Sequence, residues 1–346
     1  MPFYNDPSLS TGTNMAQNGY LRCKCVIFRV DDIGDFGKNK VQSAILDHFI
    51  TDNKKLSVGI VLNSFGNLGS DGIVYTKVKE GYEKGLFELA IHGLNHLNYS
   101  GLTEKQQNED FIEANNKLQL LFGNKSRIFI PPFNQFSSDT LKAMAESGLD
   151  IFSTSYWEES KTLNPYKVPT LFKTNGSKLQ LSEVNVNESD SRQTLKKIYH
   201  VPFNTSLLYF LREGYSGENI TQKVLSNVNK NIAKYGFSVI VLHPTDFATF
   251  NSSNRSYTNA IDPLKFQMLA NIIDSLEARG ISIVDYDDVT HPSLAEKIPN
   301  IQQEQRQTHF KHTDIHVQAN LGGISFLTNM ALLTDNNFSV LEKERF

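Results

Sequence analysis

Short apolar runs alternate with longer amphipathic segments along most of this 346-residue chain. The runs are rich in β-branched and aromatic residues, and several are continuously apolar, which is typical of parallel strands covered on both faces. The expected strands are 24–30, 57–62, 86–91, 127–131, 149–154, 167–172, 198–203, 237–243 and 281–286, and the expected helices are 39–53, 72–84, 103–122, 137–147, 218–235 and 263–279. This alternation predicts a parallel α/β barrel or a doubly wound sheet, and the number of strands favours the barrel.

Two of the expected helices carry end signals. The last one starts after Asp262, which can cap its first turn, and it ends at Gly280. The third one starts with Thr103 and Gln106 at the spacing of a capping box. These positions therefore predict where two helices begin or end.

The regular pattern covers residues 23–292, which we interpret as one barrel domain. Residues 1–22 are a polar extension, and residues 293–346 lose the periodicity and are interpreted as a C-terminal appendage. Within the barrel, the polar residues 160–200 predict an insertion or irregular loops at one barrel end.

Composition excludes several classes of partner. Thirty-four basic and 37 acidic residues give a net charge of −3, so neither nucleic acid nor an anionic membrane is an expected partner. No apolar run reaches the roughly 18 residues of a membrane span, and residues 1–22 lack the apolar core of a signal peptide. The compartment stays open, with the cytoplasm slightly favoured, and the oligomeric state is not indicated.

Cys23 and Cys25 lie on one face of an expected strand and are predicted to stay unbridged.

Two adjacent carboxylates, Asp31 and Asp32, directly follow the expected strand 24–30. Parallel α/β folds build their sites at the carboxyl ends of strands, where both side chains can reach one pocket. Alone, such a pair is more typical of a turn or a helix cap.

Histidines follow two other strands. His92 and His96 come after strand 86–91, where a helical turn would bring two imidazoles four residues apart onto one cation. His243 ends the strand 237–243. Each could instead be a polar cap or a buried, hydrogen-bonded histidine, but a common barrel rim would gather the ends of all three strands into one site.

This set of side chains suits metal-dependent amide hydrolysis. Asp32, His92 and His96 form a two-histidine, one-carboxylate set that leaves positions free for water and substrate, as catalytic zinc sites do. Asp31 can accept the proton of the attacking water, and His243 can protonate the leaving amine. The same ligands suit non-haem Fe(II), but the alternation of strands and helices disfavours those oxygenases.

Two prolines, Pro131 and Pro132, end the expected strand 127–131. Because proline has no N–H, Phe133 offers the first free backbone donor at this strand end. We predict that this N–H stabilises the oxyanion, although a rigid turn that ends the strand is an equal explanation.

The order Asp-Asp, His-Gly-Leu-Asn-His, Pro-Pro-Phe-Asn and Val-Leu-His resembles the polysaccharide deacetylase family with its NodB homology domain, and the resemblance covers roughly residues 24–290. The His-Gly-x-x-His form resembles a divergent branch. The family implies a distorted (β/α)7-type barrel and one divalent ion, with zinc expected and Co, Ni, Fe or Mn as alternatives. It implies that Asp31 is the base, that Asp32, His92 and His96 are metal ligands, and that His243 is the acid.

The chain departs from the family pattern beside the proline pair. Ile130 stands where better-known members have an Arg that orients the catalytic Asp, and Asn134 replaces their Gly. We hypothesise that Arg29, two residues before Asp31 on the same strand face, substitutes for that Arg.

Three residues, Pro132, Asn134 and Trp157, are expected to line the substrate pocket. Trp157 could equally serve core packing. Asp246 is a candidate for orienting His243, with a loop cap as the alternative role.

We therefore expect a hydrolase of carbon–nitrogen bonds other than peptide bonds that removes an acetyl group from an N-acetylated sugar or polysaccharide. One alternative is an amidase for a non-sugar amide, because only the pocket walls would differ. Another is a catalytically silent carbohydrate-binding relative, because the family Arg is missing.

Overall fold

The computed structural model describes residues 23–66, 72–155, 180–187 and 193–290. The expected strand 167–172, the polar extension, the C-terminal appendage and Trp157 lie outside these ranges. The domain boundaries at 22 and 292 therefore remain a prediction.

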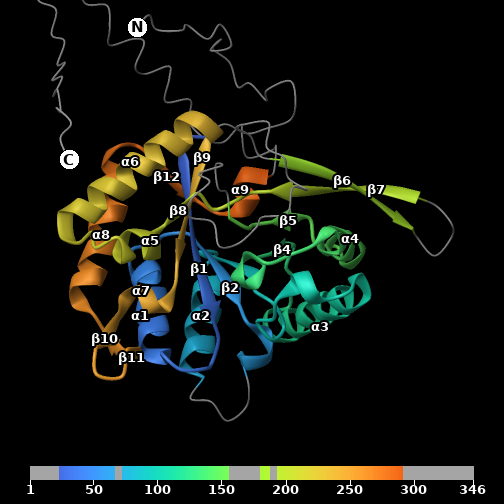
Figure 1. The fold of residues 1–346 in the computed structure, drawn as a ribbon, viewed down its shortest axis with the longest axis horizontal. Helices are drawn as coiled ribbons and strands as arrows, with labels where there is room; N and C mark the ends of the chain where they lie inside the picture. Colours follow the sequence, from blue (N-terminus) through green and yellow to red (C-terminus); the bar gives the residue numbers. More distant parts are fainter. Residues whose placement is uncertain (1–22, 67–71, 156–179, 188–192, 291–346) are drawn as a thin grey trace, which may run out of the picture. The chain divides into compact units, whose positions relative to one another are not determined.

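Strands and helices alternate along the described residues, as predicted (Figure 1). The strands are β1 (Cys25–Ile33), β2 (Leu56–Ile60), β3 (Phe87–Ile91), β4 (Ile128–Phe129), β5 (Ile151–Phe152), β6 (Gln180–Asn187), β7 (Gln193–His200), β8 (Thr205–Ser206), β9 (Phe237–Leu242), β10 (Ala248–Asn251), β11 (Ser256–Ile261) and β12 (Ser282–Val284). The helices are α1 (Asn39–Thr51), α2 (Ile73–Glu83), α3 (Glu104–Phe122), α4 (Ser138–Ser147), α5 (Leu207–Arg212), α6 (Gly217–Tyr235), α7 (Pro244–Phe247), α8 (Pro263–Ala278) and α9 (Tyr286–Thr290).

The main sheet has the strand order β6-β7-β5-β4-β3-β2-β1-β9-β8, with β12 paired to the first residues of β1. Its pairs are parallel except for β6 with β7. This curled parallel sheet with its helices confirms the predicted α/β barrel. The carboxyl ends of β1, β3 and β9 consequently meet at one edge, which is where the candidate site residues lie.

The two faces of β1 have different roles. Val26, Phe28 and Val30 belong to the large core cluster that includes residues of α1, α3 and α8. The alternate residues Cys25 and Ile27 belong to a second cluster with residues of β4 and β9, on the inner face of the sheet. Because side chains alternate along a strand, Arg29 and Asp31 continue this inner face, and they are only 1% and 3% exposed.

The predicted starts of α8 and α3 are confirmed, whereas α8 ends at Ala278, two residues before Gly280. The backbone N–H of Leu264 donates to the Asp262 carboxylate at 3.2 Å at the start of α8. At the start of α3, the Gln106 N–H donates to the Thr103 hydroxyl at 3.3 Å, and the Thr103 N–H donates to the Gln106 side chain at 3.0 Å. Both caps satisfy N–H groups that the first helical turn leaves without partners.

The prediction of an irregular segment at 160–200 is wrong for its second half. There β6 and β7 form an antiparallel hairpin, which lies beside α4 (Figure 1). A second antiparallel pair, β10 with β11, was also not predicted. These strands are polar or alternate between polar and apolar residues, whereas the prediction relied on continuous apolar runs.

The cysteine prediction is also wrong. Cys23 and Cys25 form a disulfide, and their Cα atoms lie 5.1 Å apart, within the ordinary range for such bridges. The prediction placed both residues in one strand, but β1 begins only at Cys25, and a bend at Lys24 brings Cys23 close to it. In the described ranges, the structure has no helix with the length and apolar character needed to cross a bilayer.

Candidate metal centre

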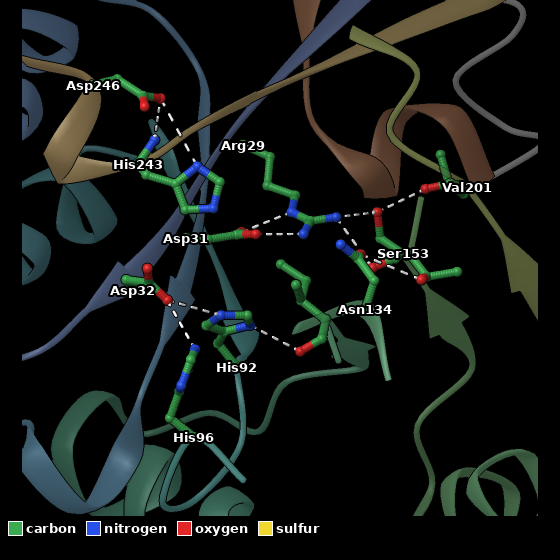
Figure 2. Close-up of polar contacts among 12 residues, drawn as sticks. Arg29, Asp31, Asp32, His92, His96, Asn134, Ser153, Val201, His243 and Asp246 are labelled. Atoms are coloured by element: carbon green, nitrogen blue, oxygen red, sulfur yellow. Dashed lines mark hydrogen bonds and ion pairs between the residues drawn. The ribbon is translucent and has the colours of Figure 1, made fainter. Parts of the chain in front are cut away.

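The structure brings Asp32, His92 and His96 together at the shared strand edge (Figure 2). The Asp32 Oδ1 atom lies 3.1 Å from the His92 Nε2 atom and 3.0 Å from the His96 Nε2 atom. One ligand atom from each residue lies within 4.8 Å of the others. Three side chains from two distant segments thus point at a single position.

The predicted helical turn between the two histidines is wrong. Residues 92–98 form an irregular loop after β3, and the two imidazole rings lie edge-on to each other with centroids 5.0 Å apart. The loop turns because Gly93 has a φ of 80°, where a Cβ atom would lie 3.2 Å from the Pro132 ring. His96 also has a positive φ, of 53°. Loop geometry therefore replaces the helical spacing.

The hydrogen bonding of His92 fits a bound cation. Its Nδ1 atom lies 2.9 Å from the carbonyl oxygen of Ile130, and a carbonyl only accepts, so Nδ1 carries the proton in the neutral ring. The Nε2 lone pair then faces the Asp32 carboxylate, which is another acceptor. A divalent ion between these acceptors satisfies both, and an imidazole held through its other nitrogen is the usual form of a metal-binding histidine. Two nitrogens and one carboxylate suit zinc and related transition metals.

Asp32 is held in its charged form. Burial raises the pKa of its carboxyl group, but the contacts with the imidazoles of His92 and His96 lower it by more, and the net pKa is below the usual range. An ionised carboxylate is the form that binds a metal ion.

Backbone strain is concentrated around this centre. Among the described residues, seven non-glycine residues have a positive φ, and four of them belong to this site: Asp32, His96, Phe133 and Asn134. A left-handed conformation costs a non-glycine residue about 1–2 kcal/mol, less for Asp and Asn. Such strain persists where the surrounding structure enforces it, most often at functional sites.

Asp31 lies against Arg29 on the inner face of β1. The Arg29 Nε atom donates to the Asp31 Oδ1 atom at 2.7 Å, and Nη2 donates to Oδ2, so the pair is bidentate. Burial raises the pKa of Asp31, but the charge and hydrogen bonds of Arg29 lower it further, leaving the net pKa below its ordinary value. A Cβ atom at Gly59 would lie 3.1 Å from Oδ1, so the glycine on the neighbouring strand leaves room for this carboxylate.

His243 and Asp246 lie at the end of β9 and the start of α7. The His243 backbone N–H donates to the Asp246 Oδ2 atom at 2.8 Å, and that oxygen lies 3.8 Å from the imidazole Nδ1 atom. Burial lowers the pKa of His243, but the nearby carboxylate of Asp246 and the charges of Asp31 and Asp32 raise it to about 9. The imidazole is therefore protonated at neutral pH.

The proline-rich segment forms a short turn over the histidine loop. Pro132 is buried, whereas the Phe133 ring is 52% exposed and stands edge-on to the His96 ring, with centroids 4.5 Å apart. The Thr154 hydroxyl donates to the Asn134 side chain at 3.3 Å. The oxyanion role of the Phe133 N–H and the substrate-binding roles of Pro132 and Asn134 stay predictions, and Trp157 lies outside the described residues.

The sequence and the fold were compared with known proteins. Residues 35–152 match the polysaccharide deacetylase family. The match contains His92, His96 and Phe133 and begins just after Asp32. No curated protein sequence matches the chain.

Three solved structures are similar to this chain at low sequence identity. A putative polysaccharide deacetylase from Mycobacterium smegmatis has 13% identity and a TM-score of 0.50, with 83% of this chain and 92% of that chain covered. An acetyl xylan esterase of family 4 from Clostridium thermocellum, in complex with a cobalt ion, has 14% identity, a TM-score of 0.46 and coverages of 78% and 96%. A CE4 family pseudoenzyme from Bacillus anthracis has 12% identity, a TM-score of 0.46 and coverages of 79% and 67%. The first of these shows the deacetylase fold.

Sequence reasoning missed two contributors to the centre. The Ile130 carbonyl orients His92, and no sequence signal marks a backbone oxygen. Gly59 had a signal, because a glycine inside an apolar strand often marks a close approach.

Proposed function

We propose that this protein is a metal-dependent hydrolase that removes the acetyl group from an N-acetylated sugar or polysaccharide. The observation that carries the proposal is the convergence of Asp32, His92 and His96 beside the buried carboxylate of Asp31. The match of residues 35–152 to the polysaccharide deacetylase family supports the choice of a deacetylase over other metal-dependent hydrolases. Zinc is the proposed metal, because two imidazoles and one carboxylate with open positions are typical of its catalytic sites.

Each residue near the centre has a proposed role. Asp32, His92 and His96 would hold the divalent ion, which would supply Lewis acidity toward the amide carbonyl and water. Asp31 accepts the proton of the water that attacks the carbonyl carbon, and the Phe133 N–H donates to the oxyanion. His243 gives its proton to the amine nitrogen as the C–N bond breaks, which releases acetate and the free amine.

The contact between Arg29 and Asp31 argues against a silent relative. The family Arg is absent at Ile130, but a guanidinium still pairs with both oxygens of the proposed base. Arg29 lies on β1, the same strand as Asp31. The proposed base is therefore held in a fixed orientation by a residue at a different position in the sequence from the family Arg.

Acetate release tests the proposal. The full chain, loaded with zinc, is incubated with chitotetraose in its fully N-acetylated form, with acetylated xylan and with non-sugar N-acetyl amides. Free acetate is then measured. We expect release from the chito-oligosaccharide. Release only from the non-sugar amides would make the protein an amidase, and release only from xylan would make it an esterase. Retained zinc and glycan binding without any release would indicate a silent relative.

Asp246→Asn is expected to shift the basic limb of the pH–rate profile to lower pH. The Asp246 charge favours protonated His243, whose pKa is about 9, so the acid form persists up to that pH and is lost above it. Asparagine removes the charge and leaves the burial, so the pKa falls, by about one pH unit or more. The profile of kcat between pH 6 and 10 measures this shift.

Asp262→Asn is the matched control, because Asp262 caps α8 through the Leu264 N–H, and asparagine also serves as a cap. Its profile is expected to overlay that of the wild type. An unchanged basic limb in Asp246→Asn would remove Asp246 from the proposed mechanism.

A further inference from the structure

The guanidinium of Arg29 is held on its far side as firmly as on the side of Asp31. Its Nη1 atom donates to the carbonyl oxygen of Ser153 at 3.1 Å and to the Ser153 hydroxyl at 3.0 Å. Its carbon atom lies 5.1 Å from the centre of the Phe203 ring, which covers one face of the planar group. Figure 2 shows Ser153 on the opposite side of the guanidinium from Asp31. Ser153 therefore fixes which way the Arg29 fork points.

The Ser153 hydroxyl has one assignment of protons. It donates to the Val201 carbonyl oxygen at 2.7 Å, because a carbonyl cannot donate. It accepts from the Arg29 Nη1 atom, because a guanidinium cannot accept. The Tyr286 hydroxyl lies 2.8 Å away and must therefore be the donor in that pair. Burial raises the pKa of Tyr286 to about 12, so the phenol keeps its proton at neutral pH.

The backbone of Tyr286 is held near the start of β3, at the end of the strand opposite the metal centre. Tyr286 is fully buried, and its backbone N–H donates to the Glu88 carboxyl group of β3 at 3.0 Å. The N–H of Asp287 donates to the other oxygen of Glu88 at 2.9 Å. The same strand, β3, leads directly into His92. Hydrogen bonds made by Tyr286 of α9 therefore connect Glu88, near the start of β3, to Asp31 through Ser153 and Arg29.

We infer that Tyr286 and Ser153 are positioning residues for Asp31, which they act on through Arg29. The inference rests on the proposed role of Asp31 as the base. Neither residue reaches the metal centre. Ser153 holds the guanidinium by its Nη1 edge, and Tyr286 holds the Ser153 hydroxyl, so that Nε and Nη2 present a fixed fork to the carboxylate. Without this support, the Arg29 guanidinium is held less firmly at Nη1 and can turn away from Asp31.

Two readouts on the zinc-loaded full chain test the inference. The first is the hydrogen exchange rate of the Arg29 Nε–H group, followed by NMR with labelled arginine and assigned by its loss in Arg29→Lys. The second is kcat and KM for chitotetraose. In Tyr286→Phe and in Ser153→Ala we expect exchange to be faster and kcat lower, each by about tenfold, with KM and zinc content unchanged.

Tyr75→Phe is the matched control. It also removes a tyrosine hydroxyl that donates one hydrogen bond, in this case to the backbone carbonyl of Leu121, and it lies in α2, away from Arg29. Both readouts should stay at the wild-type values. Two variants guard against a folding defect in either one, since each removes a different link of the chain.

Exchange or kcat within twofold of wild type in both variants would overturn the inference. If the wild type releases no acetate, the proposed function fails, and the exchange rates alone then decide whether Tyr286 and Ser153 hold Arg29. Faster exchange in both variants would support that holding role, and unchanged exchange would overturn it.

Discussion

Asp31→Asn is expected to lower kcat for deacetylation by about a hundredfold to ten-thousandfold, the range typical of a lost general base. Asparagine keeps the size of the side chain but cannot accept the proton of the attacking water. Because Asp31 is not among the three converging ligands, the zinc content should stay at the wild-type level. Acetate release and metal analysis of the same preparation measure both effects.

The substitution also leaves the Arg29 charge buried without its partner, which is expected to lower the free energy of unfolding by about 3–5 kcal/mol. The double variant Arg29→Met with Asp31→Asn removes both charges and should regain most of that stability, without regaining activity. A single variant that keeps more than a tenth of the wild-type kcat would show that Asp31 is not the base.

His96→Ala is expected to weaken zinc binding by roughly a hundredfold or more, since even partners of ligands contribute tenfold to a hundredfold. His96 is the better of the two histidines for this test, because its side chain is 28% exposed and belongs to a loop, so its removal leaves the core intact. Titration calorimetry with zinc measures the affinity. Acetate release should fall with metal content.

His92→Gln is a second test of the ligand set, and His48→Gln is its matched control. His92 is a proposed ligand. His48 lies in α1, where its imidazole is 3.5 Å from the Asp52 carboxylate. The first variant should lose zinc and the second should retain it. Equal zinc affinity in His96→Ala, His92→Gln and the wild type would contradict the assigned ligand set.

The barrel could be predicted from sequence because its strands are continuously apolar. The residues of β1, β3 and β9 have no reason to be so apolar unless both faces are covered, and parallel strands end at one shared edge. That rule alone placed Asp32 near the two histidines, although 60 residues separate it from His92. The α8 and α3 starts were equally readable, because Asp262 and Thr103 act locally.

What the sequence could not show is set by loops and by buried polar groups. The His92–His96 spacing suggested a helical turn, but the positive φ of Gly93 and His96 produced a different loop with the same convergence. The β6–β7 hairpin was missed because half-polar strands have no continuous apolar run. Tyr286 lies 255 residues beyond Asp31, and only the fold shows that a hydrogen-bond chain joins them.

X-ray absorption spectroscopy at the zinc edge, on the full chain loaded with one equivalent of zinc, is the most direct test of the central claim that one ion binds between Asp32, His92 and His96. The account predicts two imidazole nitrogens at about 2.0–2.1 Å with oxygen ligands completing the shell, and one imidazole fewer in His96→Ala. A spectrum without imidazole scattering, or one that His96→Ala leaves unchanged, would contradict it.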